Sequence, residues 1–217
     1  MISERVSSVS EVLLVAPVRG LAAEVPLVLG QVESFAPEVV GLGLSVDEMT
    51  ALNEYFVLSE ADPIVPLTTT ETSEVRGLSR FGEVRVPNPT FVELLRWSRG
   101  HGIPVEALDP GDDHTASLFT EHIGYVELVR RTVKERAVSR RPPTPATADE
   151  FALEWDREVA GGRGSRDFAR ARDGFLVRGA QRIGAGRSRV AVVVDRERFD
   201  LVRALLRGTV PRTIGDD

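Results

Sequence analysis

The sequence predicts an α/β fold: a mostly parallel, or mixed, central sheet with helices on both faces and an inserted helical region. Short apolar runs alternate with amphipathic segments along the 217 residues, and this alternation is typical of parallel α/β sheets. The apolar runs are nearly continuous, as in strands that helices cover on both sides. Because this length suits one ordinary domain, we expect residues 1–217 to form a single α/β domain.

The first half of the chain supplies three of the predicted strands, each a short, apolar, β-rich run. They occupy residues 11–18, 38–44 and 103–108. Each helix between them has a start signal. Pro26 falls in the first turn of the first helix, where its missing N–H costs little. Ser45 and Glu48 form a capping-box pattern for the second helix, and Asn88 followed by Pro89 begins the third.

Two segments between the second and third helices have no helical pattern. Residues 61–72 are rich in Pro and Thr, which predicts a loop. Residues 81–86 alternate apolar and polar side chains. This alternation predicts an extra strand or one arm of an edge hairpin.

The second half of the chain predicts the helical insertion and the last strand. A turn at residues 109–113 leads into one long helix that reaches about Arg136. Residues 139–148, SRRPPTPATA, form a Pro-rich linker that we expect to be extended and exposed. Two further helices, a strand at residues 189–194 and a final helix follow, and the tail at residues 209–217 is expected to be flexible.

The composition of the chain excludes several kinds of site. The absence of cysteine rules out disulfides, zinc–thiolate sites and thiol nucleophiles. The net charge of −6 disfavours a broad nucleic-acid surface. No apolar run reaches the roughly 20 residues of a membrane span, and Met1–Ser10 lacks the pattern of a signal peptide. We therefore expect a soluble, cytoplasmic protein with no membrane span and no nucleic-acid partner.

Polar residues that directly follow predicted strands are the candidate catalytic groups. Asp109 and His114 follow the third strand, and Asp195 and Glu197 follow the last one. In open α/β sheets, ligands bind beyond the carboxyl ends of the strands, so these four side chains would share one rim. The alternative is ordinary helix capping by the acidic residues of each turn, which also places Asp before a helix. Both interpretations remain open at this point.

Arginine residues are the candidate ligand contacts. Arg19, Arg166 and Arg196 are predicted to contact an anion, because the guanidinium group binds carboxylates and phosphates with two donors. Arg166 alternatively forms a surface ion pair with its neighbour, and such pairs contribute little. Gly41 and Gly43 follow a strand but lack the third glycine of a dinucleotide-binding motif, so we interpret them as close-packing positions. No metal site and no cofactor is predicted.

The order and spacing of these segments resemble the TraB/PrgY family, which belongs to a larger group with TIKI, GumN, EreA and ChaN-like proteins. The resemblance covers most of the chain. Its anchors are LLVAPVRG at 13–20, PEVVGLGLSVDE at 37–48, PNPTFVELLRWSRGHGIPVEALD at 87–109, SRDFARARDGFLVRG at 165–179 and VAVVVDRERFDLVRALL at 190–206. It implies the α/β fold described above, and it implies metal-assisted or acid–base hydrolysis as the family chemistry, including peptide cleavage in TIKI-like members.

Three positions depart from the family motifs. Val18 stands where a GTxH-type turn has its histidine, Gly43 stands in the acidic position of a VELD-like strand, and Glu197 lies near the histidine of a G-x-x-H turn. Asp109 and the Arg166-Asp167 pair do match common features of the family. Hydrolysis needs imidazole and carboxylate groups that converge. The resemblance, with these departures, therefore implies a degenerate active site.

A non-catalytic TraB-like protein is the function that this pattern predicts, one that binds a small ligand or a protein partner through the remnant family cleft. One alternative is a divergent, metal-assisted, peptidase-like hydrolase that uses acidic and histidine residues at the carboxyl ends of strands. The other is an oligomeric scaffold in which the linker at residues 139–148 and its flanking helices bind a partner. The partner is unknown. In a homo-oligomer, the partner would be a second copy of this chain.

Overall fold

The computed structural model has a central five-stranded sheet with the strand order β1-β2-β5-β3-β4. The structure describes residues 1–7, 11–57 and 67–208. The strands are β1 (Ile2–Ser7), β2 (Glu11–Ala16), β3 (Val39–Leu42), β4 (Val105–Ala107) and β5 (Arg189–Val193). Strands β2, β5, β3 and β4 run parallel, and β1 pairs antiparallel with β2. The predicted α/β class with a mostly parallel, mixed sheet is therefore confirmed.

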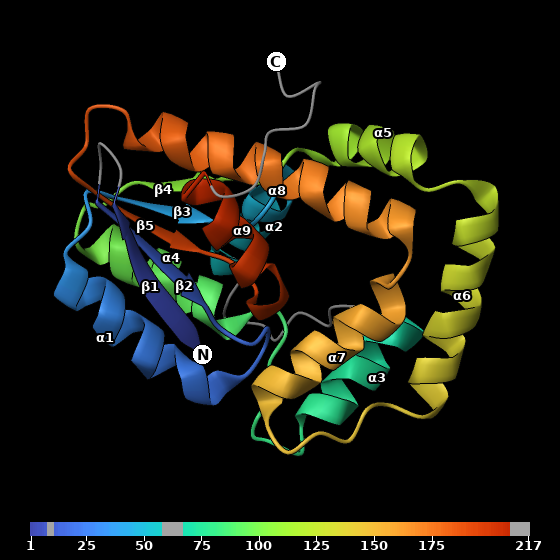
Figure 1. The fold of residues 1–217 in the computed structure, drawn as a ribbon. Helices are drawn as coiled ribbons and strands as arrows, with labels where there is room; N and C mark the ends of the chain where they lie inside the picture. Colours follow the sequence, from blue (N-terminus) through green and yellow to red (C-terminus); the bar gives the residue numbers. More distant parts are fainter. Residues whose placement is uncertain (8–10, 58–66, 209–217) are drawn as a thin grey trace.

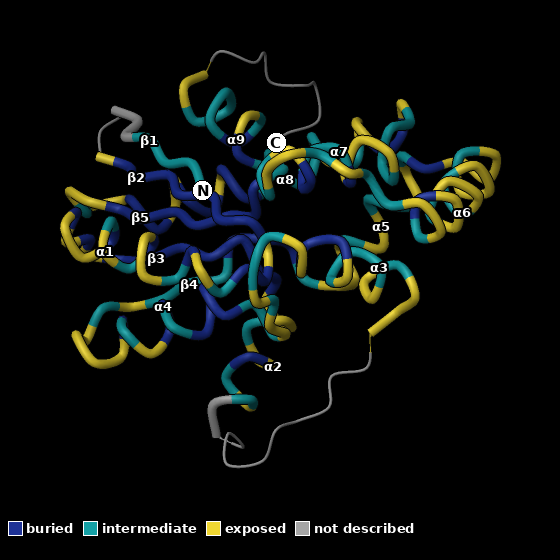
Figure 2. The backbone as a smooth tube through the Cα atoms, turned by 90° about the horizontal axis from the view of Figure 1, so that it is seen from below, coloured by how far each residue is buried: buried dark blue, intermediate teal, exposed yellow. Residues whose placement is uncertain are grey.

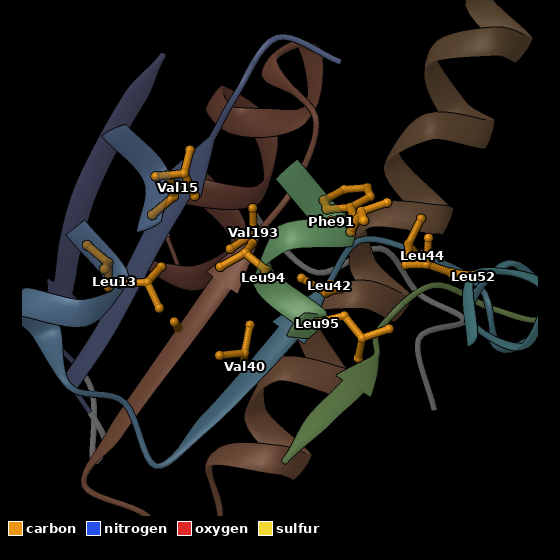
Figure 3. Close-up of a cluster of buried hydrophobic side chains, with 14 of the residues drawn as sticks. Leu13, Val15, Val40, Leu42, Leu44, Leu52, Phe91, Leu94, Leu95 and Val193 are labelled. Carbon is orange, nitrogen blue, oxygen red and sulfur yellow. The ribbon is translucent and has the colours of Figure 1, made fainter. Parts of the chain in front are cut away.

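Helices cover both faces of this sheet (Figure 1). Helices α1 (Val25–Phe35) and α4 (Pro89–Gly100) pack on one face, and α8 (Arg163–Gly184) and α9 (Phe199–Leu206) pack on the other. Alternate strand residues point to opposite faces. Accordingly, Leu13 and Val15 join the α1–α4 cluster, whereas Leu14 joins the α8–α9 cluster. Figure 3 shows the first cluster, with strand side chains facing Phe91 and Leu94 of α4.

The inserted helical region lies beyond the carboxyl edge of the sheet, at the right of Figure 1. It contains α3 (Thr69–Leu78), α5 (Asp112–His122), α6 (Tyr125–Arg140) and α7 (Ala148–Ala160). Helix α2 (Val46–Val57) follows β3, and two short 3-10 helices, η1 (Ala22–Glu24) and η2 (Arg196–Arg198), precede α1 and α9. A third apolar cluster joins this region to the end of β2, and at its centre Phe151 and Trp155 of α7 pack with Val18.

Most predicted element boundaries and caps are confirmed. The Ser45 hydroxyl accepts a hydrogen bond from the Glu48 N–H, and the Asn88 side chain caps α4. The two strand glycines lie in tight packing, as predicted. A Cβ atom on Gly41 would collide with the side chain of Leu108, and one on Gly43 would press on Val194 at 3.2 Å.

The prediction of one long helix after residue 113 was wrong, because the segment forms two helices. Helix α5 ends at His122, and the extended backbone of Gly124 precedes α6. The Glu127 carboxylate then accepts hydrogen bonds from the Gly164 and Ser165 N–H groups at 2.9 and 2.7 Å. This contact ties the start of α6 to the start of α8, and it requires a change of direction that a continuous helix would prevent.

Two other predictions were incomplete or wrong, and one strand was missed. The predicted loop at residues 61–72 overlaps α3, whose first turn is stabilised by a capping box between Thr68 and Glu71. The predicted strand at residues 81–86 is reduced to one bridge between Leu21 and Val84. Strand β1 was not predicted at all. Residues 61–66 of the predicted loop, and the predicted flexible tail at residues 209–217, lie outside the described residues.

Helix α6 exposes much of its surface to solvent (Figure 2). Tyr125, Val126 and Val133 are apolar side chains that it leaves in solvent. Residues 141–147 of the predicted linker connect α6 to α7 without regular structure. In the described part of the chain, no helix combines the length and the apolar character that a membrane crossing requires. Partner binding by the linker at residues 139–148 and its flanking helices stays a prediction.

Candidate functional site

The carboxyl ends of four parallel strands meet at the edge of the sheet that faces α3 and α7 (Figure 1). Strand β2 leads to Arg19, β3 to Ser45, β4 to Asp109 and β5 to Asp195. The pairing of β2 with β5 places the ends of the first and last predicted strands side by side. This edge therefore gathers several of the residues that the sequence nominated, as expected for an open α/β sheet.

Arg19 and Asp195 form an ion pair at this edge. The Arg19 Nε and Nη2 atoms both donate to Oδ2 of Asp195, at 2.9 and 2.5 Å. The Asp195 side chain is only 2% exposed, whereas that of Arg19 is 52% exposed. Oδ1 of Asp195 is buried and has no hydrogen-bond partner within the described residues. The carboxylate of Asp195 raises the pKa of Arg19 above its ordinary value, so Arg19 stays protonated.

More carboxyl groups than cations surround this pair. Glu74 of α3 and Glu197 of η2 both interact electrostatically with Arg19. Burial, with a further contribution from Asp195, raises the pKa of Glu197 to about 8. Burial also raises the pKa of Glu74, and Arg19 opposes that rise. Burial first, and the neighbouring Asp195 charge second, thus keep Glu197 largely protonated at neutral pH.

The raised pKa of Glu197 predicts a specific dependence of stability on pH. Between about pH 5 and 8 the folded chain holds a proton on Glu197 that the unfolded chain, with an ordinary pKa of 4.5, releases. Stability should therefore fall as the pH rises through this window, by up to about 1.4 kcal/mol per pH unit from this group. Glu197→Gln should flatten that slope. The variant should be as stable as the wild type near pH 4 and more stable than the wild type at pH 9. Urea unfolding at several pH values measures this dependence. The prediction is contradicted if the free energy of unfolding changes with pH equally in the two proteins.

A cavity of about 390 Å³ opens beside Arg19. It lies between α2, α3 and the start of α4, and its volume is in the range of pockets that hold small molecules. Its apolar lining consists of Leu44, Ala51, Leu52, Leu67, Val75, Leu78, Val84, Val86, Pro87 and Phe91. Its polar lining consists of Arg19, Glu48, Tyr55, Glu71, Glu74, Arg85 and Asn88.

Most of the charged groups in the lining already have partners. Glu48 and Glu71 accept hydrogen bonds from backbone N–H groups at the starts of α2 and α3. Arg85 forms an ion pair with Glu83 at 2.9 Å. Within the described residues, the Glu74 carboxylate forms no hydrogen bond, and the Nδ2 atom of Asn88 is buried without a partner. Glu74 is therefore a lining carboxylate with hydrogen-bonding capacity left for a ligand, whereas the Nδ2 atom of Asn88 is not exposed to the cavity.

Asp109 belongs to a separate, buried ion network. Its fully buried carboxylate accepts hydrogen bonds from Arg198 Nη1 and Nη2 at 2.6 and 2.7 Å, and from Arg172 Nη2 at 2.5 Å. Arg198 Nε also donates to Asp173 at 2.6 Å, and burial raises the pKa of Asp173 to about 6. The network links the end of β4 to α8 and η2, and it leaves the Asp109 carboxylate without exposed surface for a substrate.

Within the described residues, the other nominated residues form no hydrogen bond or ion pair with Arg19, although Arg196 follows its partner Asp195 in the chain. His114 is exposed on α5, with its ring 5.3 Å from that of Phe175. Arg166 is exposed and donates to the Gly161 carbonyl at 3.0 Å. Arg196 is buried and donates to Asp149 at 3.0 Å. In residues 1–7, 11–57 and 67–208, no three His, Asp or Glu side chains are arranged so that they could hold a metal ion.

The helix-capping alternative is confirmed in part: Asp195 is the N-cap residue of η2, and Asp112 and Asp113 lie in the first turn of α5, but no side-chain cap hydrogen bond forms at either helix start. The Asp195 side chain forms no cap hydrogen bond with η2 and holds Arg19 instead. Helix α5 begins after Gly111, and the first N–H, that of Asp112, donates to Asp47 of α2 at 2.9 Å. Sequence reasoning missed Glu74 because it missed α3, although the T-x-x-E capping pattern at Thr68 was present.

The fold and the cavity together define the class: an α/β protein with a pocket of small-molecule size at the carboxyl edge of its parallel strands. No protein-family model matches the chain, and no curated protein is detectably similar to it. The TraB-like resemblance therefore stays a prediction. Of the positions it assigns, Val18 is buried in the cluster around Phe151, and Gly43 lies against Val194.

Proposed function

We propose that this chain is a non-catalytic protein that binds a small, mainly apolar molecule in the cavity beside Arg19. The observation that carries the proposal is a 390 Å³ cavity with mainly apolar walls, lined also by the Glu74 carboxylate, which forms no hydrogen bond within the described residues. Under the TraB-like resemblance, this cavity is the remnant family cleft. The apolar packing of Val18 supports a cleft without the family's histidine at that position.

The apolar walls supply the binding energy in this proposal. Removing apolar surface from water stabilises a complex by about 25 cal/mol per Å². A ligand that buries about 200 Å² of such surface therefore gains about 5 kcal/mol before the costs of ordering. The few polar groups orient the ligand rather than hold it, as in most small-molecule pockets.

Filling the cavity should abolish ligand binding. Ala51 lies on α2, lines the cavity and is exposed, so a larger side chain there enters the cavity without displacing the core. We expect Ala51→Trp to weaken binding by at least about tenfold, or 1.4 kcal/mol. Glu54→Trp, on the same helix but outside the lining, is the matched control and should bind like the wild type. Ligand-observed NMR with a fragment library measures both.

Equal binding by the wild type and Ala51→Trp would place the ligand elsewhere and contradict the proposal. A library in which no compound binds the wild type would contradict it as well. The same preparations should be assayed for bound metal and for peptide hydrolysis, because stoichiometric metal with turnover would show that the protein is catalytic.

The second candidate function is the divergent hydrolase, and the environment of Glu197 favours it. A carboxyl group with a pKa of about 8 is well suited to general acid–base catalysis near neutral pH. Asp195 and Arg19 adjoin it and would orient a substrate. Glu197 is not part of the cavity lining, which is why binding without turnover is proposed first. Peptide hydrolysis that is lost in Glu197→Gln would establish this alternative.

A further inference from the structure

The cavity has an acidic wall that its arginines do not neutralise. Glu48, Glu71 and Glu74 line it together with Arg19 and Arg85. Each of the two arginines is paired with a carboxylate outside the lining, Arg19 with Asp195 and Arg85 with Glu83. Arg19 also acts on Glu71 and Glu74, but the three lining glutamates outnumber the two lining arginines, and each of these arginines already holds another carboxylate.

Glu74 is the member of this wall that is free to contact a ligand. The carboxylates of Glu48 and Glu71 already accept hydrogen bonds from helix-start N–H groups, whereas that of Glu74 forms none within the described residues. Partial burial makes its negative charge costly, and a nearby cation would offset that cost. Arg19, the cation that acts on Glu74 among the described residues, already donates from both Nε and Nη2 to Asp195.

We infer that the ligand of this cavity is an amine cation with an apolar body, whose ammonium group contacts Glu74. The hydrocarbon part lies against Leu52 of α2 and Phe91 of α4. Arg19 by itself would favour an anionic ligand, but its Nε and Nη2 groups already donate to the Asp195 carboxylate. This inference rests on the proposed function and names the class of ligand for the same cavity.

Three matched probes test the inference. They are 4-phenylbutylamine, 4-phenylbutan-1-ol and 4-phenylbutanoate, which share an apolar body and differ in charge. Titration calorimetry at pH 7 should show the amine binding at least about tenfold more tightly than the alcohol, and the carboxylate binding most weakly. Glu74→Gln should weaken the amine about tenfold, to the level of the alcohol, and leave the alcohol unchanged. Glu33→Gln, on the exposed face of α1, is the control and should change neither affinity.

The outcomes separate this inference from the function on which it rests. If all three probes bind equally, or the carboxylate binds best, and Ala51→Trp abolishes their binding, the cavity is a ligand site but the amine inference is overturned. If Glu74→Gln weakens the amine and the alcohol alike, the side chain acts structurally and the inference is also overturned. If the probes bind and Ala51→Trp changes none of the affinities, the cavity is not the site and both proposals fail.

Discussion

Asp109→Ala is expected to lower the free energy of unfolding by about 3–5 kcal/mol, the usual cost of removing one partner from a buried ion pair. The Asp109 carboxylate is fully buried, and Arg198 and Arg172 donate three hydrogen bonds to it. Arg198 is itself 11% exposed, so without Asp109 its charge stays largely buried with only Asp173 as a partner. The loss should affect the contact of β4 with α8 and η2 first.

Urea unfolding followed by circular dichroism measures this change. Asp167→Ala is the matched control, because Asp167 forms an exposed ion pair with Arg163 at 3.8 Å. Removing such a pair should change stability by no more than about 1 kcal/mol. A loss of less than about 1 kcal/mol in Asp109→Ala would show that the network does not hold the strand end in place.

Gly77→Ala is expected to lower stability by about 1–3 kcal/mol in the wild type and to raise it when Phe151 is truncated. Gly77 lies on α3, and a Cβ atom there would overlap the Phe151 ring. That ring is fully buried and stacks on Trp155 with centroids 5.7 Å apart, so it cannot move aside cheaply. Phe151→Ala removes the collision, and alanine is then the better helix former by about 1 kcal/mol.

A double-mutant cycle measures this reversal of sign. Phe151→Ala alone should cost about 3–5 kcal/mol because it leaves a cavity in the third apolar cluster. Phe151→Leu replaces it in the cycle if the alanine variant is too unstable to measure. Additive effects of the two substitutions would mean that Gly77 and Phe151 are not in contact, and would contradict the packing of α3 against α7.

Local signals in the chain were sufficient to predict most elements. The runs at residues 11–18 and 189–194 became β2 and β5, because apolar β-rich segments of strand length are buried in almost any α/β packing. The caps at Ser45 and Asn88 were also predictable, because a capping hydrogen bond joins residues within three positions of each other.

Contacts between distant segments could not be predicted in this way. The break between α5 and α6 accompanies hydrogen bonds from Gly164 and Ser165 to Glu127, which are 37 and 38 residues away. Strand β1 forms by pairing with β2, and its own residues carry no distinctive apolar run. Nothing local distinguishes such segments from loops.

For the candidate site, the sequence was enough to name Arg19, Asp195 and Glu197, because each follows a recognisable strand and parallel strands end at one edge. It could not show that Asp195 pairs with Arg19, 176 residues away, or that Asp109 belongs to a different network. Ionic and hydrogen-bond energies depend on distances of a few ångströms. Those distances are set by the strand order and by the placement of α3 against the sheet edge, which arise only when the chain packs.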